Sequence, residues 1–427
     1  MQEPHMEINE DIVIVGAGIA GLATSLGLHR LGLRSLVLES SNSLRSAGFA
    51  LTLWTNAWRA LDALGVADSL RQHSLQIGGF RVASAVSGLP PSETPLVTKG
   101  KQGDYESRCV RRKELLETLE KALPNGTIRY SSKVVSIEES GCFKLLHLAD
   151  GSILKTKVLI GCDGVNSFVA KWLGLQNPVH AGRSAIRGLA EFPDSHGFGR
   201  SIFMCFGGGV RCGFVPCDEK TLYWFCTFTA SLKNDEDMEE NPAKMKQFVL
   251  SKINGKVPQQ VADVVERTEL DGISCSQLKL RLPWNVLVGD IVKGNVCVAG
   301  DALHPMTPDI GQGGCSALED SVVLARCLGE ALLTRKQRGE MIRNEERDDN
   351  KDQEIERRIK KGLEKFAKER RWRSFRLIST AYVVGLMQES DGKVMSFLRE
   401  KFLSRFTAGI FLMMADFDCG ELINSVV

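Results

Sequence analysis

A glycine-rich turn near the N-terminus constrains the fold more than any other feature of the sequence. The apolar run 11–15 leads into the pattern G-x-G-x-x-G at 16–21, which precedes a helix-like stretch ending at Leu31 and a second apolar run at 35–39. Strand, glycine turn, helix and strand in this order form the first unit of a Rossmann-type sheet. The sequence therefore predicts an α/β fold with a dinucleotide site at this turn.

Each glycine of this turn has a separate expected role. Gly16 makes the tight turn, Gly18 lets the backbone approach a pyrophosphate, and Gly21 lets the helix pack closely on the strand. Glu39 follows Gly21 by 18 positions (39 − 21) and can accept hydrogen bonds from a ribose diol. The pattern alone also occurs in glycine-rich turns of unrelated α/β proteins, so the order of the surrounding elements carries the interpretation.

A second strand end follows a hairpin-like region at 130–155, in which Asp150-Gly151 is a turn signal. The apolar run 157–161 leads to Cys162 and then to Asp163-Gly164. A carboxylate at the end of a parallel strand reaches a crevice instead of the core. An Asp-Gly pair by itself is a common turn, so this site needs support from the rest of the chain.

The third strand end is the segment 300–314, which follows the apolar run 296–299 and precedes a helix-like stretch at 315–333. The segment holds four glycines and two prolines, which is typical of backbone that approaches a ligand closely. A helix starting near Gly313 would direct its positive end into the turn. We expect an electron-rich, planar ligand there.

Composition limits the class of protein. The 427 residues are 43% hydrophobic and 25% charged with a formal charge of +2, which fits one large or two intertwined domains without nucleic acid as a partner. The twelve cysteines form no C-x-x-C pair, and they are typical of reduced thiols inside a cell. The first apolar run is a strand and no stretch is long enough to cross a membrane, so we expect an intracellular, cytoplasmic location, with an organelle left open.

Taken together, the three strand ends resemble the group A FAD-dependent monooxygenases, the para-hydroxybenzoate and salicylate hydroxylase family. The order of the motifs and the run beginning at Val134 look most like the plant branch of this family. The resemblance implies a Rossmann-like, GR2-type FAD-binding domain, an inserted mixed β-sheet substrate domain and a helical C-terminal part. Its expected boundaries are 1–75, 103–175 and 285–333 for the FAD domain, 76–102 and 176–284 for the substrate domain, and 334–427 for the helical part.

The resemblance also assigns cofactor contacts. It implies that Asp301 holds the ribitol chain, that Arg112 lies near the FAD, and that Asp163-Gly164 serves both FAD and the reduced nicotinamide. It places the backbone of Pro308 and 311–314 against the isoalloxazine. The full implied set is Gly16, Ala17, Gly18, Ile19, Ala20, Gly21, Glu39, Ser40, Gly48, Arg112, Val134, Asp163, Asp301, Pro308, Gly311, Gln312, Gly313 and Gly314.

The chemistry implied by the resemblance is carried by the flavin. NAD(P)H reduces FAD, and O2 then forms a flavin C4a-hydroperoxide that hydroxylates or epoxidises a small apolar or aromatic molecule. The sequence has no second G-x-G-x-x-G unit for the nicotinamide, so NAD(P)H is expected to bind transiently as a co-substrate. No catalytic side chain is assigned, and the choice between NADH and NADPH stays open.

Substrate contacts are expected between Gly174 and Leu282, where short apolar runs alternate with turn signals. Tyr223 and Trp224 are adjacent in one run and face opposite sides of the strand, so only one of them can line a pocket. Arg211, like Arg187, could bind a carboxylate. Ordinary sheet packing and a solvated arginine are the alternatives for these residues.

Two departures from the family pattern leave other functions open. The arginine usual seven positions after the motif aspartate is Ala170 here, followed by Lys171, and Ser40-Ser41 replaces a basic residue usual after Glu39. A non-catalytic FAD-binding protein is therefore one alternative. A flavin-dependent halogenase is disfavoured because the sequence has no W-x-W-x-I-P segment.

The remaining features predict structural roles. His304 is expected to be structural, and the other histidines have no metal-binding spacing. The charged stretch 334–376 predicts a solvated helix. The apolar stretches 378–387 and 402–414 are expected to pack against the body, with peripheral membrane contact and the oligomeric state left open.

Overall fold

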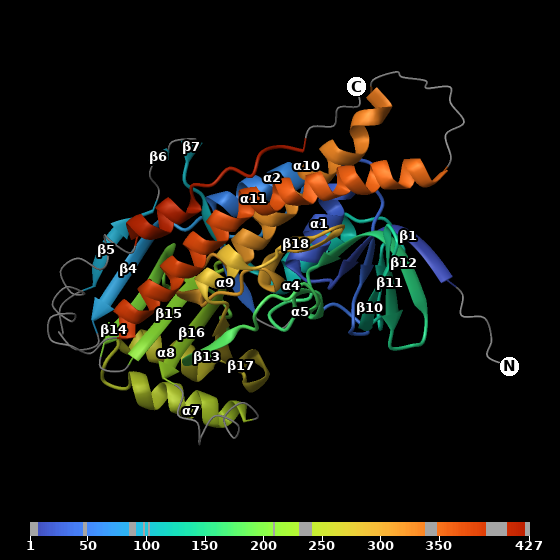
Figure 1. Cartoon of the computed structure of the whole chain (residues 1–427). Helices are drawn as coiled ribbons and strands as arrows, with labels where there is room; N and C mark the ends of the chain where they lie inside the picture. The colour runs from blue at the N-terminus through green and yellow to red at the C-terminus, as the bar shows by residue number, and fades with distance from the viewer. Residues whose placement is uncertain are drawn as a thin grey trace.

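The computed structural model describes residues 7–45, 49–84, 91–96, 99–100, 103–207, 210–229, 241–337, 348–389 and 408–422. Figure 1 shows two sheets side by side, with helices packed on them and one long helix running across both. The predicted α/β class, with an FAD-type first domain and a mixed second sheet, is confirmed. The residues at which the domains divide remain a prediction.

The first sheet has eight strands in the order β10–β11–β12–β1–β2–β9, with β19 beside β12 and β18 beside β19. Strands β9, β2, β1, β12 and β19 pair in parallel, so their carboxyl ends share one edge. The antiparallel pair β11–β12 turns at the predicted Asp150-Gly151 site. The strands are β1 (Glu7–Val15), β2 (Leu36–Leu38), β9 (Ile128–Arg129), β10 (Val134–Ser140), β11 (Phe143–Leu148), β12 (Ile153–Gly161), β18 (Val292–Lys293) and β19 (Val296–Val298).

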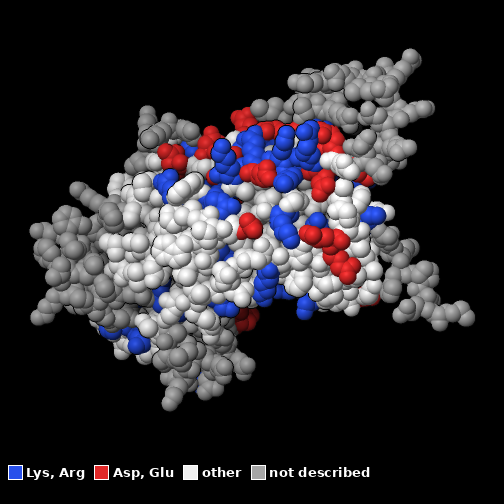
Figure 2. All heavy atoms as spheres, in the orientation of Figure 1, with Lys and Arg blue, Asp and Glu red and all other residues white. Residues whose placement is uncertain are grey.

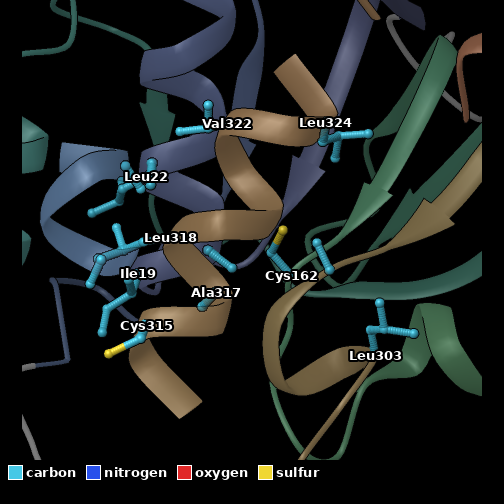
Figure 3. Close-up of a cluster of buried hydrophobic side chains, with 14 of the residues drawn as sticks. Ile19, Leu22, Cys162, Leu303, Cys315, Ala317, Leu318, Val322 and Leu324 are labelled. Atoms are coloured by element: carbon cyan, nitrogen blue, oxygen red, sulfur yellow. The ribbon is translucent and has the colours of Figure 1, made fainter. Parts of the chain in front are cut away.

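Helices α1 (Ile19–Arg30) and α10 (Gly313–Gln337) pack against each other beside this sheet. Figure 3 shows buried side chains of both helices packed together, with Cys162 close to Ala317 of α10 and Leu303 further away. A methyl group added at Gly27 would lie 2.8 Å from the Cβ of Ala325, so the two helices pack at close range. Smaller helices complete this part: α2 (Thr55–Leu64), α3 (Ala67–Arg71), α4 (Arg112–Lys121), α5 (Phe168–Trp172) and α9 (Pro283–Val288).

The second sheet has seven strands in the order β17–β13–β16–β15–β14–β4–β5. Strand β4 pairs in parallel with β14 while the other neighbours are antiparallel, which makes the sheet mixed. Helices α7 (Pro242–Ile253) and α8 (Gln259–Arg267) contribute to a second hydrophobic core with this sheet. The strands are β4 (Gly79–Ser84), β5 (Ser92–Pro95), β13 (Val179–Glu191), β14 (Ser201–Gly207), β15 (Val210–Pro216), β16 (Thr221–Thr229) and β17 (Ile273–Leu280).

Two short antiparallel pairs lie outside the large sheets. Strand β3 (Ala50–Trp54) pairs with β8 (Ser107–Arg111), and β6 (Lys99–Gly100) pairs with β7 (Gly103–Asp104). Because α4 begins directly after β8, Arg112 stands at the junction of a strand and a helix.

The long helix α11 (Asp348–Glu389) crosses the molecule and contacts α10, α9 and β14 (Figure 1). Figure 2 shows lysines, arginines and acids intermingled along the surface at this helix. The solvated helix predicted over 334–376 is only partly right, because Arg370 and Arg373 are buried, and residues 338–347 lie outside the described residues. The later part of α11 buries Leu377, Ile378, Ala381 and Val384, so this apolar stretch packs against the body. Residues 408–415 form a further helical segment, whereas 402–407 lie outside the described residues. Among the described residues, no helix combines the length and apolar character that crossing a bilayer requires.

Candidate functional site

The three strand ends singled out in the sequence are immediate neighbours in the first sheet. Val15 pairs with Gly161, and Gly161 pairs with Val298, so β1, β12 and β19 end at the same level. The three motifs that follow these strands therefore open onto one crevice. Ligands of open α/β sheets bind at this position, outside the carboxyl ends of the strands.

The three glycines of the first turn have different surroundings: two are closely packed and one faces open space. Gly16 has a φ of +104°, and a side chain there would meet the Cys162 carbonyl oxygen at 2.5 Å. A Cβ at Gly21 would lie 1.9 Å from the Gly16 carbonyl oxygen. At Gly18, by contrast, a Cβ would meet no described atom within 4 Å. Of these three glycines, only Gly18 therefore faces space that a ligand can fill.

Glu39 is held by the backbone of the same turn. Its carboxylate accepts hydrogen bonds from the Ala17 N–H at 3.0 Å and the Ser41 N–H at 2.8 Å. The Arg45 guanidinium lies 3.6 Å from this carboxylate and donates to the Ser40 hydroxyl at 2.8 Å. Arg45 thus supplies a positive charge near Ser40 and Ser41, where relatives usually carry a basic residue. The sequence directly after Glu39 does not show this, because Arg45 lies several residues further along the chain.

The carboxylate of Asp163 caps helix α5. It accepts hydrogen bonds from the backbone N–H groups of Phe168 at 2.6 Å and Val169 at 3.2 Å, and from the Ser167 hydroxyl. Burial outweighs these hydrogen bonds and raises the pKa of Asp163. The side chain therefore organises the turn, while the neighbouring backbone faces the crevice.

The family departure at position 170 has a structural consequence. The side chain of Ala170 is buried in the core, whereas Lys171 is exposed. Adjacent helical residues point about 100° apart, so Lys171 does not project where a side chain at 170 would. Lys171 is therefore a poor replacement for the family arginine.

The third segment surrounds the crevice with backbone. Two short 3-10 turns, η2 (Gly300–Ala302) and η3 (Pro308–Ile310), lead to Gly311, whose φ of +61° is left-handed. Helix α10 begins at Gly313, where a Cβ would meet no described atom within 4 Å. The helix N-terminus thus directs its free N–H groups toward an open space.

A cavity of about 370 Å³ lies where these segments meet the second sheet. One side is formed by the three motifs and Arg112, and the other by β13, β15 and β16. Its lining residues are Gly18, Ile19, Ala20, Ala50, Leu51, Thr52, Arg112, Cys162, Gly164, Ala185, Arg187, Val215, Tyr223, Phe225, Asp301, Met306, Thr307, Pro308, Gly311, Gly313, Gly314 and Ala317.

Arg112 and its neighbour Arg111 point to different surroundings. Arg112 lines the cavity, and its Nε has no hydrogen-bond partner among the described residues. Burial lowers the pKa of Arg112, although Asp301 opposes this shift. Arg111 instead pairs with Asp218 at 3.2 Å and with Glu191 at 3.5 Å. Of the two arginines, only Arg112 is placed to meet a ligand.

Of the adjacent aromatic pair, Tyr223 lines the cavity and Trp224 does not. The Trp224 ring is fully buried on the other face of the sheet, where it covers Gly188, and its Nε1 donates to the Thr268 hydroxyl at 2.8 Å. The expectation of a substrate contact at Trp224 is therefore corrected. Alternation along β16 also brings Phe225 to the cavity, although no pattern in the sequence singled this residue out.

The expectation for Arg211 is also corrected. Its guanidinium forms a buried ion pair with Asp309, which also binds Arg183 through two hydrogen bonds of 3.0 and 2.8 Å. Arg187 of β13, rather than Arg211, lines the cavity. The sequence could not show this, because Arg211 and its partner Asp309 lie 98 positions apart (309 − 211).

Replacing Asp309 with asparagine is expected to lower the free energy of unfolding by about 3 kcal/mol, since it removes a buried carboxylate that faces both Arg183 and Arg211. Burial raises the pKa of Asp309, but Arg211 and Arg183 together hold it below its usual value. The ion pairs therefore stabilise the fold above about pH 4, and this stability is lost as the pH falls through the lowered pKa. Urea unfolding at pH 7 and at pH 3 measures both effects. An unchanged midpoint at pH 7 would contradict this role.

The remaining residues of the implied set are placed as follows. Val134 starts β10 with its side chain in the core, and the Gln312 side chain is buried, accepting a hydrogen bond from Asn56 at 2.8 Å. Gln312 itself is not among the residues that line the cavity. His304 is buried against Asp320, as its expected structural role requires. Gly48 lies outside the described residues.

Three observations indicate that the residues around the cavity fit a flavin dinucleotide. Each motif contributes a lining glycine at which an added Cβ would meet no described atom within 4 Å; these are Gly18, Gly164 and Gly313. The Arg112 guanidinium brings a buried donor, Nε, that has no partner among the described residues. The N-terminus of α10 adds N–H groups that favour negative charge.

Comparison with known proteins agrees with this geometry. A family described as "FAD binding domain" matches residues 9–356. Monooxygenase 2 of Arabidopsis thaliana is 54% identical over 98% of this chain and 99% of its own length, and Monooxygenase 1 of the same plant is 34% identical over 96% and 99%. An arginine-to-glutamine variant of Klebsiella pneumoniae HpxO, solved with FAD, shares the fold with a TM-score of 0.76 at 22% identity, covering 96% of this chain and 98% of that one.

The fold and the three motifs thus define a flavin-binding protein of the Rossmann-like type. The chain belongs to the group A FAD-dependent monooxygenase family, and it is similar to the plant members of that family along nearly its whole length.

Proposed function

We propose that this protein is an NAD(P)H-dependent FAD monooxygenase that uses O2 to hydroxylate or epoxidise a small apolar or aromatic molecule. The observation that carries the proposal is the cavity that joins the three FAD motifs to the apolar face of the second sheet. Cofactor and substrate would share this space, as an oxygen transfer between them requires. Membership of the monooxygenase family supports the reaction class.

FAD would be held by the first turn and Glu39 at its ADP half, and by Arg112, Asp301 and the 308–314 backbone at its flavin half. Bound FAD supplies hydride acceptance from NAD(P)H and activation of O2. The residues of this chain orient the ring, and the N-terminus of α10 offers N–H groups that stabilise negative charge without releasing a proton. Apolar side chains of the second sheet exclude water from the space beside it.

The side of the cavity formed by the second sheet predicts the kind of substrate. Val215 and Phe225 are apolar, while the Tyr223 hydroxyl and Arg187 are the polar groups contributed by this sheet. Burial raises the pKa of Tyr223 to about 12, so its phenol stays protonated at neutral pH and can donate a hydrogen bond. An apolar or aromatic molecule bearing an oxygen acceptor fits this lining.

Replacing Tyr223 with phenylalanine is expected to lower kcat/KM about tenfold, because one hydrogen bond to the substrate is lost, while FAD content stays unchanged. The matched control is Trp224→Phe at the next position. That change should lower the melting temperature and leave kcat/KM of the folded enzyme within about twofold. The assay uses the compound that most stimulates NAD(P)H oxidation. A larger catalytic loss in Trp224→Phe than in Tyr223→Phe would reverse the assignment of the two faces.

The proposed function is tested with the purified chain. We expect a yellow protein with the absorption bands of oxidised flavin, and NAD(P)H oxidation that rises when a phenolic or terpenoid from a panel is added. The same assay with NADH and NADPH in parallel identifies the reductant. A colourless protein that also fails to take up added FAD would refute the proposal.

A second candidate is a non-catalytic FAD-binding protein, which the buried Ala170 and exposed Lys171 favour. Such a protein would be yellow and yet show no NAD(P)H oxidation above the rate of free FAD. The same panel assay distinguishes the two candidates. NAD(P)H oxidation that never exceeds the rate of free FAD, with any compound of the panel, would support the non-catalytic candidate.

A further inference from the structure

A buried cluster of charged side chains connects helix α11 to the segment 300–314. Glu319 and Asp320 of α10 face Arg370 and Arg373 of α11, and all four are buried. Arg370 bridges the two acids, with its Nε 2.6 Å from Asp320 and its Nη2 2.7 Å from Glu319. Arg373 binds Glu319 at 2.7 Å. Two acids are thus matched by two arginines away from water.

Asp320 holds the start of the segment. Its Oδ2 accepts a hydrogen bond from the Gly300 N–H at 2.7 Å and lies 2.6 Å from Nε2 of His304. Gly300 has a φ of +61°, and Asp301 of the cavity lining follows it directly. The direction in which Asp301 leaves the strand therefore depends on a carboxylate that Arg370 fixes from the other side.

Glu319 holds the end of the segment through Asn56. The Nδ2 of Asn56 lies 2.5 Å from Glu319 Oε1 and 2.8 Å from Gln312 Oε1. Gln312 stands between Gly311 and Gly313, both of which line the cavity. The same arginine therefore supports both ends of the cofactor segment, one through each acid.

The C-terminal chain closes this cluster from solvent. The ring of Phe417 lies 4.9 Å from the guanidinium carbon of both Arg370 and Arg373, and Arg373 also donates to the Met414 carbonyl. Burial raises the pKa values of Glu319 and Asp320, but their neighbours outweigh it and lower both: Arg373 and then Arg370 at Glu319, and His304 and then Arg370 at Asp320. The acids are therefore ionised, and Arg370 is the arginine that both of them share.

We propose that Arg370 is a positioning residue for the cofactor: by fixing Asp320 and Glu319, it sets the geometry of segment 300–314 and thereby FAD affinity and flavin potential. Helix α11 then contributes to FAD binding through Arg370, in addition to packing against α10. The proposal rests on the FAD binding assigned above. It concerns a residue that does not line the cavity and acts through other side chains.

The test compares Arg370→Met with Arg371→Met, using full-length protein stripped of FAD and then titrated with FAD. Arg371 is the matched control, because it is the next residue of α11 and its guanidinium donates instead to the carbonyls of Val286, Leu287 and Gly289. Binding is read from FAD fluorescence at a temperature where circular dichroism shows both variants folded. The midpoint potential of the bound flavin is the second measurement.

We expect the FAD Kd to rise about tenfold or more in Arg370→Met and to change less than about twofold in Arg371→Met. The flavin potential should become more negative in the first variant only, because the α10 N–H groups lose their alignment with the reduced ring. If Arg370→Met does not fold, Arg370→Lys decides, since a single ammonium does not reproduce the fork that bridges two acids. It should then show a smaller shift of the same sign.

Wild-type affinity and potential in the folded Arg370 variants would overturn the proposal, as would equal changes in the Arg371 control. A wild-type chain that binds no FAD would instead refute the proposed function. The two failures are therefore distinguishable.

Discussion

Replacing Gly18 with valine is expected to give a folded protein that no longer retains FAD. A Cβ at Gly18 meets no described atom within 4 Å, and the residue has an extended backbone with a φ of −80°, which valine adopts easily. The added side chain therefore enters the cavity, where it occupies the space assigned to the pyrophosphate. FAD absorbance per protein after gel filtration measures retention, and thermal unfolding of the FAD-free proteins measures the fold.

The control is Gly409→Val. Gly409 also has no described atom within 4 Å of a Cβ, but it lies in the exposed part of the helical segment 408–415. This variant should retain FAD like the wild type. Stoichiometric FAD in a folded Gly18→Val protein would show that the ligand does not pass this turn.

The second large effect is expected from Asp301→Ala. Asp301 lines the cavity beside Arg112, where the family resemblance assigns it to the ribitol chain. Loss of a charge-assisted hydrogen bond costs about 1.5–3 kcal/mol, which corresponds to a rise in FAD Kd of roughly 10- to 100-fold. Such a protein should lose its FAD during purification, because dissociation becomes faster. Titration of the FAD-free protein with FAD gives the Kd.

Two further variants test whether the loss of FAD affinity is specific to the carboxylate of Asp301. Asp301→Asn keeps the shape and one acceptor, so its FAD affinity should fall between those of the wild type and Asp301→Ala. Asp290→Ala removes an exposed acid that does not line the cavity, and it should bind FAD normally. Full FAD occupancy in purified Asp301→Ala would refute the role given to Asp301.

The sequence predicts the motif-bearing half of the site well, because its signals are local. Each of the three glycine-rich segments follows a short apolar run, and all three runs became adjacent parallel strands. Gly18 and Gly313 both border open space, since an added Cβ would meet no described atom within 4 Å. The expected turn and the expected helix start predict both of these positions. Local backbone rules are sufficient for these features.

The other half of the site depends on partners that are distant in the sequence. Alternation showed that Tyr223 and Trp224 face opposite ways, but only the pairing of β16 within the second sheet shows which of them meets the cavity. The expectation for Arg211 failed because its partner, Asp309, belongs to the segment 300–314. Arg370 acts on that segment through its ion pair with Asp320, and these two residues lie 50 positions apart in the sequence (370 − 320). No local pattern encodes such pairs.

The most direct test of the monooxygenase assignment follows the oxygen atoms. The purified chain is incubated with FAD, NAD(P)H and the most stimulating compound of the panel under ¹⁸O2, and the product is analysed by mass spectrometry. We expect a product that carries a single ¹⁸O atom derived from O2, with NAD(P)H consumed as it forms. NAD(P)H oxidation that yields only hydrogen peroxide with every compound, or a product whose oxygen derives from water, would show that the protein is not a monooxygenase for these compounds.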